Sequence, residues 1–115
     1  MELERLRTFC LSLPGATEDI KWGHDLCFCV GAKMFCVASM EPPLTFSFKV
    51  TDEEYDELSI RTGFEPAPYM ARNKWVLVND PSKVKPKEVE KLVRQSYQLI
   101  ASKLTKKLRV ELGLS

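Results

Sequence analysis

The sequence lacks the long apolar run that a membrane-spanning helix needs. No stretch of the 115 residues approaches the roughly 20 apolar residues that cross a bilayer. The first residues, from Met1 to Arg5, also lack the basic and then apolar order of a secretory signal peptide. We therefore expect a cytoplasmic protein that does not associate with membranes.

Recognisable catalytic machinery is also missing. The chain has a single histidine, His24, and no nucleophile motif accompanies it. The five glycines are scattered singly, so no glycine-rich loop is available to cradle a phosphate group. These absences predict a non-enzymatic protein that needs no cofactor.

A large net charge is absent, but the charge is unevenly distributed. The formal net charge is +1. Residues 1–80 carry a net charge of −5, whereas residues 81–109 carry nine basic and two acidic side chains, a net charge of +7. A basic segment of this kind suits phosphate, an anionic lipid surface or an acidic protein, and an ordinary solvated helix face has the same composition.

Four cysteines are present, in a pattern that argues against a metal site. His24, Cys27, Cys29 and Cys36 offer four soft ligands. However, a C-x-C pair on a flat strand holds its sulfurs about 7 Å apart, too far for one tetrahedral ion. Cys27 and Cys36 would suit a disulfide across a hairpin, but a cytosolic protein keeps its thiols reduced. We expect four free thiols, with Cys10 buried, and no metal.

The spacing of apolar residues predicts one domain over residues 1–115, in which helices and strands alternate. The predicted elements are a helix at 2–12, an extended segment at 13–22, strands at 26–30, 33–37, 44–50 and 74–78, and helices from 51 to about 61 and from 86 to 104. Thr51 and Glu54 form a capping-box pattern, and two prolines predict an extended turn at 65–68. Whether the last helix continues through Thr105 stays open.

The three central strands predict a sheet with one apolar face. A two-residue type II′ turn at 31–32 would place Phe28 opposite Phe35 and Cys27 opposite Cys36. The predicted core face consists of Leu26, Phe28, Val30, Phe35, Val37, Leu44, Phe46 and Phe48. The opposite face consists of Cys27, Cys29, Met34, Cys36, Thr45, Ser47 and Lys49. We also expect both tryptophans, Trp22 and Trp75, to lie in the core.

Several separate sequence blocks resemble the MmcQ/YjbR family. The blocks are Leu13-Pro14-Gly15-Ala16-Thr17-Glu18-Asp19, Lys21-Trp22-Gly23, Val30-Gly31-Ala32-Lys33-Met34-Phe35, Phe48-Lys49, Pro66-Ala67-Pro68-Tyr69, Lys74-Trp75-Val76 and Ser96-Tyr97. The resemblance implies a CyaY-like (frataxin-like) α+β fold with two layers, in which helices pack on one face of an antiparallel sheet of about five strands. It also implies DNA binding through a double-wing arrangement of β-hairpins.

On this basis we expect a monomer whose partner is DNA. The candidate phosphate contacts are Lys33, Lys49, Arg72 and Lys74, with Tyr69 supporting them or stacking on a base. An alternative is a module that binds a protein or a small ligand. It would use the sheet face that the helices leave uncovered or the loop from Pro66 to Tyr69, because exposed apolar groups on a sheet face often mark a contact surface.

Overall fold

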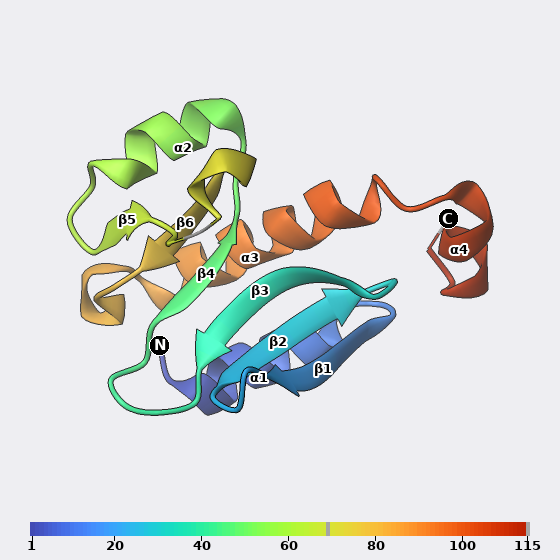
Figure 1. Cartoon of the computed structure of the whole chain (residues 1–115), viewed down its shortest axis with the longest axis horizontal. Coiled ribbons are helices and arrows are strands. Elements are labelled where there is room, and N and C mark those ends of the chain that lie inside the picture. Colours follow the sequence, from blue (N-terminus) through green and yellow to red (C-terminus); the bar gives the residue numbers. More distant parts are fainter. Residues whose placement is uncertain (69, 115) are drawn as a thin grey trace.

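The protein forms a six-stranded antiparallel sheet packed against helices. The computed structural model describes residues 1–68 and 70–114. Within them the elements are α1 (Leu3–Ser12), β1 (Ala16–Lys21), β2 (Asp25–Val30), β3 (Lys33–Ser39), β4 (Phe46–Lys49), α2 (Asp52–Ser59), β5 (Phe64–Pro66), β6 (Trp75–Val78), α3 (Pro86–Ala101) and α4 (Lys106–Glu111). Two short 3-10 helices, η1 (Ala71–Asn73) and η2 (Pro81–Lys83), complete the chain (Figure 1).

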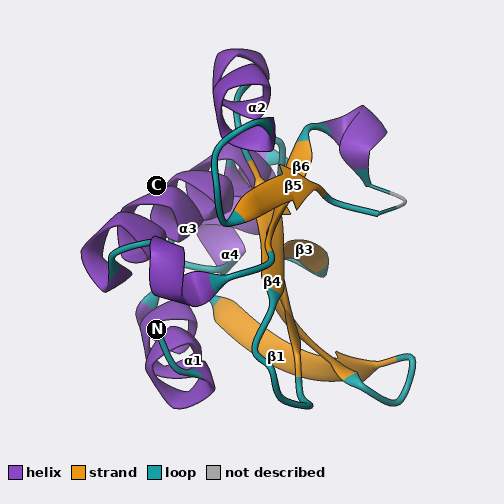
Figure 2. Ribbon diagram, turned by 90° about the vertical axis from the view of Figure 1, so that its left-hand side faces the viewer, coloured by secondary structure: helices purple, strands orange, loops and turns teal. Residues whose placement is uncertain are grey.

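The sheet separates a helical layer from an open face. Its strand order is β1-β2-β3-β4-β6-β5. Figure 2 shows the sheet nearly edge-on, with α1 and α3 on one side of it. The predicted α+β fold is therefore confirmed. No helix in the described part of the chain is both long and apolar enough to cross a bilayer.

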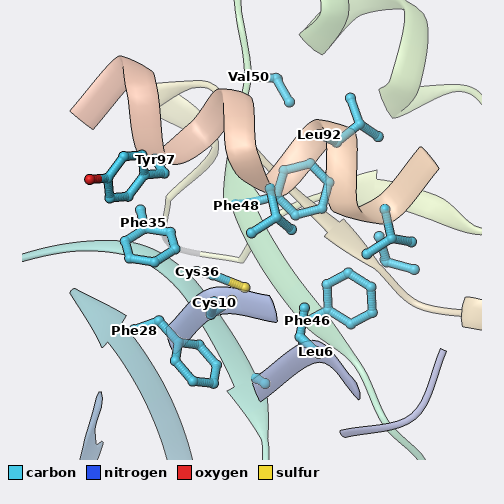
Figure 3. Close-up of a cluster of buried hydrophobic side chains, with 14 of the residues drawn as sticks. Leu6, Cys10, Phe28, Phe35, Cys36, Phe46, Phe48, Val50, Leu92 and Tyr97 are labelled. Carbon is cyan, nitrogen blue, oxygen red and sulfur yellow. The ribbon is translucent and has the colours of Figure 1, made fainter. Parts of the chain in front are cut away.

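The core lies between the sheet and the helices α1 and α3. Four phenylalanines from three strands, Phe28, Phe35, Phe46 and Phe48, are at most 1% exposed and pack with residues such as Leu6, Cys10, Val89 and Val93 (Figure 3). The helices α1, α2 and α3 begin within one residue of their predicted positions. The capping box at the start of α2 is present, because Thr51 and Glu54 each satisfy the other's backbone N–H.

The register of β2 and β3 differs from the predicted one because β3 contains a bulge. Val30 lies opposite Lys33 as predicted, but Phe28 lies opposite Cys36 and not opposite Phe35. The extra residue lets Phe35 and Cys36 both enter the core. From Cys36 onward, each β3 side chain lies on the face opposite to the predicted one. The prediction of Val37 in the core is therefore wrong.

The same bulge separates the cysteines. Cys27 lies opposite Val37, so the predicted pairing of Cys27 with Cys36 is wrong. Cys36 packs in the core together with Cys10, and it does not share the open face with Cys27 and Cys29. All four cysteines are free, as expected.

Two further details correct the predictions, and a third answers the question left open at Thr105. Trp22 is 65% exposed, whereas Trp75 is buried as expected. Residues 64–66 form a sixth strand where the sequence predicts an extended turn, since an edge strand tolerates the missing N–H of Pro66. The last helix stops at Ala101, and the Thr105 hydroxyl accepts a hydrogen bond from the Leu108 N–H to begin α4.

Candidate functional site

The candidate phosphate-binding residues lie in two separate places. Lys33 begins β3 at the tip of the β2–β3 hairpin. Lys49 ends β4, while Arg72 and Lys74 lie in η1 and directly after it. Tyr69 lies outside the described residues.

Lys49 has a structural role at the second place. Its Nζ donates a hydrogen bond to the carbonyl oxygen of Asn73 at 2.6 Å, which ties β4 to η1. Burial lowers the pKa of the Lys49 ammonium, and the positive charge of Lys103 lowers it further. Lys49 therefore holds the η1 segment and lies close to a second lysine.

Lys74 lies against an acidic helix. Its Nζ is 4.8 Å from the centre of the Tyr55 ring in α2, a cation–π contact. Five of the eight residues of α2 are acidic: Asp52, Glu53, Glu54, Asp56 and Glu57. These carboxylates oppose the approach of a phosphate to Lys74. Arg72, in contrast, is an exposed side chain on η1.

Three lysines that the sequence analysis did not select as phosphate contacts lie at the junction between α3 and α4, on which the hairpin tip packs. A Cβ at Gly31 would lie 2.8 Å from Leu104 and 3.1 Å from Leu108, so the tip packs on the junction between α3 and α4. Lys33 faces this junction, since it pairs directly with the core residue Val30. We call the exposed residues Lys33, Lys103, Lys106 and Lys107 the basic corner.

The open face of the sheet carries a pocket of about 760 Å³. We call it the open-face pocket, and its lining residues are Trp22, His24, Asp25, Met34, Val37, Ser47, Pro68 and Met70. They come from the β1–β2 turn, from strands β2, β3 and β4, and from the loop before η1. In Figure 2 the turn and the loop both project on the side of the sheet opposite the helices. The pocket thus joins the two features of the alternative hypothesis, the uncovered sheet face and the loop at 66–69.

Trp22 stands at the rim of the open-face pocket in an unusual conformation. Its φ is 56°, that of Gly23 is 76°, and the His24 N–H bonds to the Lys21 carbonyl, which makes a type I′ turn. This turn favours asparagine before glycine, whereas a bulky side chain there is strained. Next to it, the Nδ1 of His24 lies 3.1 Å from a carboxylate oxygen of Asp25.

Two other kinds of chemistry have little support. Among residues 1–68 and 70–114, no group of three or more His, Cys, Asp and Glu side chains is arranged to hold a metal ion. Burial raises the pKa of the Cys27 thiol to about 11 and also raises that of Cys29. Both groups stay protonated at neutral pH, which disfavours a nucleophilic role.

A family model and two solved structures are similar to this chain. The YjbR family model matches residues 11–99. The crystal structure of the Deinococcus radiodurans protein DR2400, a DUF419 domain, is similar with a TM-score of 0.88 and 30% identity, over 98% of this chain and 88% of that one. A protein from Pseudomonas syringae has the same fold, with a TM-score of 0.71 and 20% identity over 86% of this chain and 98% of its own. No curated protein matches.

Proposed function

The chain belongs to the YjbR family, and from this premise we propose that it is a non-enzymatic protein that binds DNA through the basic corner. Lys33, Lys103, Lys106 and Lys107 contact the phosphates. Lys49 positions the η1 segment, from which Arg72 reaches a neighbouring phosphate.

The observation that carries this proposal is the meeting of the β2–β3 hairpin with the α3–α4 junction. Lys33 belongs to a block that the family resemblance covers, and Lys103, Lys106 and Lys107 come from the segment with a net charge of +7. No ion pair within the described residues involves any of these four lysines. Their charges are therefore available to a polyanion.

Lys49 extends this surface toward η1. Its ammonium is close enough to Lys103 for the two charges to repel. A bound phosphate would relieve that repulsion. Lys74 is assigned no phosphate because it lies against Tyr55 of α2, a helix with five acidic side chains.

The test is a titration of fluorescent 20-nucleotide duplex and single-stranded DNA, followed by anisotropy at several salt concentrations. The informative variant carries Lys103→Gln, Lys106→Gln and Lys107→Gln. The matched control carries Lys85→Gln, Lys87→Gln and Lys91→Gln, which removes the same charge from exposed positions at the N-terminal end of α3, away from the basic corner.

We expect the first variant to bind DNA more weakly. In a plot of the logarithm of the association constant against the logarithm of the salt concentration, its slope should be shallower by about 0.9 for each phosphate that its side chains no longer neutralise. The control should keep the wild-type salt slope. Equal losses of affinity in both variants would mean that the net charge of the protein, and not the basic corner, determines binding. An absence of wild-type binding at low salt would refute the proposal.

A further inference from the structure

The open-face pocket has the properties of a small-molecule site and is separate from the basic corner. Its volume of about 760 Å³ is within the range of cavities that enclose small ligands. Trp22 is 65% exposed at its rim, in a turn position that an asparagine would occupy without strain. An exposed indole that the backbone holds at a cost is unexplained by folding alone.

The apolar part of the pocket suits a flat aromatic ring. Met34, Val37, Met70 and the indole of Trp22 line it. Thioether sulfurs make favourable contacts with aromatic rings, and an indole stacks on them in an offset arrangement. Both methionines are only partly buried, so they are accessible to a ligand.

The polar part of the pocket suits a hydrogen-bond donor with a positive charge. Asp25 contributes a carboxylate, which His24 also contacts at 3.1 Å, and Ser47 contributes a hydroxyl. On β1, Lys21 lies directly opposite Asp25, and Asp19 lies opposite Cys27. The two aspartates exceed the one lysine by one negative charge, and an ammonium group complements this excess.

We propose that the open-face pocket binds a small molecule that carries a planar aromatic ring and a protonated amine. The ring stacks on Trp22 between the two methionine side chains. The amine donates a hydrogen bond to Asp25. This inference does not depend on DNA binding, since none of the basic-corner lysines lines the pocket.

The four methionines provide an internal control for the test. The protein is labelled with ¹³C at the methionine methyl groups, and tryptamine is titrated as the probe. Met34 and Met70 line the open-face pocket, whereas Met1 and Met40 lie together at a different surface. We expect the signals of Met34 and Met70 to shift with tryptamine at about 1 mM, the range of weak fragments, and those of Met1 and Met40 to stay in place.

Two analogues and three variants test the assigned contacts. 3-Methylindole lacks the amine and indole-3-propionate reverses the charge, so both should bind less tightly than tryptamine, the acid by about tenfold or more. Trp22→Ala should weaken tryptamine by about tenfold, while Ile60→Ala, which truncates a side chain that is 88% exposed, should leave it unchanged. Asp25→Asn should remove the preference for tryptamine over 3-methylindole.

The proposal fails if no probe shifts Met34 and Met70, or if all four methyl signals shift alike. It also fails if Trp22→Ala leaves the titration unchanged. Equal affinities for tryptamine and 3-methylindole would overturn the assignment of the amine to Asp25. Whether the same sample binds DNA is a separate measurement, and it tests only the proposal for the basic corner.

Discussion

The hydroxyl of Ser96 on α3 donates a hydrogen bond to the carbonyl oxygen of Phe35 on β3, at 2.6 Å. The oxygen of the Ser96 hydroxyl in turn accepts a hydrogen bond from the backbone N–H of Lys49 on β4, at 2.9 Å. Ser96 therefore satisfies one backbone group from each of two adjacent strands just where their direct pairing ends at Cys36 and Phe48. The side chain is fully buried.

Ser96→Ala should destabilise the protein by about 2–3 kcal/mol, because it leaves a buried N–H and a buried carbonyl unpaired. Urea unfolding at neutral pH measures the loss. Ser102→Ala is the control, since the Ser102 hydroxyl bonds only to an exposed carbonyl of its own helix. A loss at Ser96 no larger than at Ser102 would show that water replaces the hydroxyl.

The ion pair between Arg61 and Glu88 should support stability only above acidic pH. Two hydrogen bonds of 2.6 and 2.8 Å join the side chains, and those bonds hold the pKa of Glu88 below its usual value. The unfolded carboxyl binds a proton first as the pH falls, so the contribution is present above about pH 4.3 and disappears below it.

Glu88→Gln should therefore cost less than about 1 kcal/mol at pH 7, because the pair is partly exposed, and less still at pH 3. Chemical denaturation at the two pH values measures the difference. Glu41→Gln, at an exposed position, is the matched control. An equal cost of Glu88→Gln at both pH values would assign the effect to packing.

Alkaline pH should destabilise the reduced protein through Cys27. Burial raises the pKa of this thiol to about 11, whereas an unfolded cysteine ionises near pH 8.5. Between these values the unfolded state binds fewer protons than the native state, so the free energy of unfolding falls as the pH rises. Cys27→Ala should reduce that fall by about 1 kcal/mol between pH 8.5 and 10. Urea unfolding in the presence of reductant measures the stability at each pH. An unchanged dependence of stability on pH in Cys27→Ala would refute the assignment to Cys27.

Trp22→Asn should stabilise the protein by about 0.5–1 kcal/mol, since asparagine adopts the left-handed conformation more readily than tryptophan. The midpoint of thermal unfolding should rise by a few degrees. The same variant should lose the binding of tryptamine. A lower midpoint would mean that the indole supports the fold and is not held at a cost.

Much of the fold follows from local patterns. The apolar spacing of α3 and the pairing of Thr51 with Glu54 involve residues a few positions apart, so the sequence displays them directly. The bulge in β3 has no such local mark. It brings both Phe35 and Cys36 into the core, next to a hydroxyl from Ser96, which lies 61 positions after Phe35.

The candidate site is predictable only in part. Lys33 is in a family-matching block. The other three lysines of the basic corner come from α4 and the turn before it, and the cap at Thr105 that separates α4 from α3 is not marked in the apolar pattern. The sequence predicts Trp22 in the core because an apolar side chain in an extended segment is usually buried. Its positive φ places it instead at the rim of a pocket.

The alternation of side chains along β3 has a thermodynamic consequence. Lys33 faces the junction of α3 and α4, and its neighbour Met34 lines the open-face pocket. A single rigid element thus contributes adjacent residues to both proposed sites. Any occupant of one site that displaces this hairpin changes the affinity of the other, and the change is reciprocal by linkage.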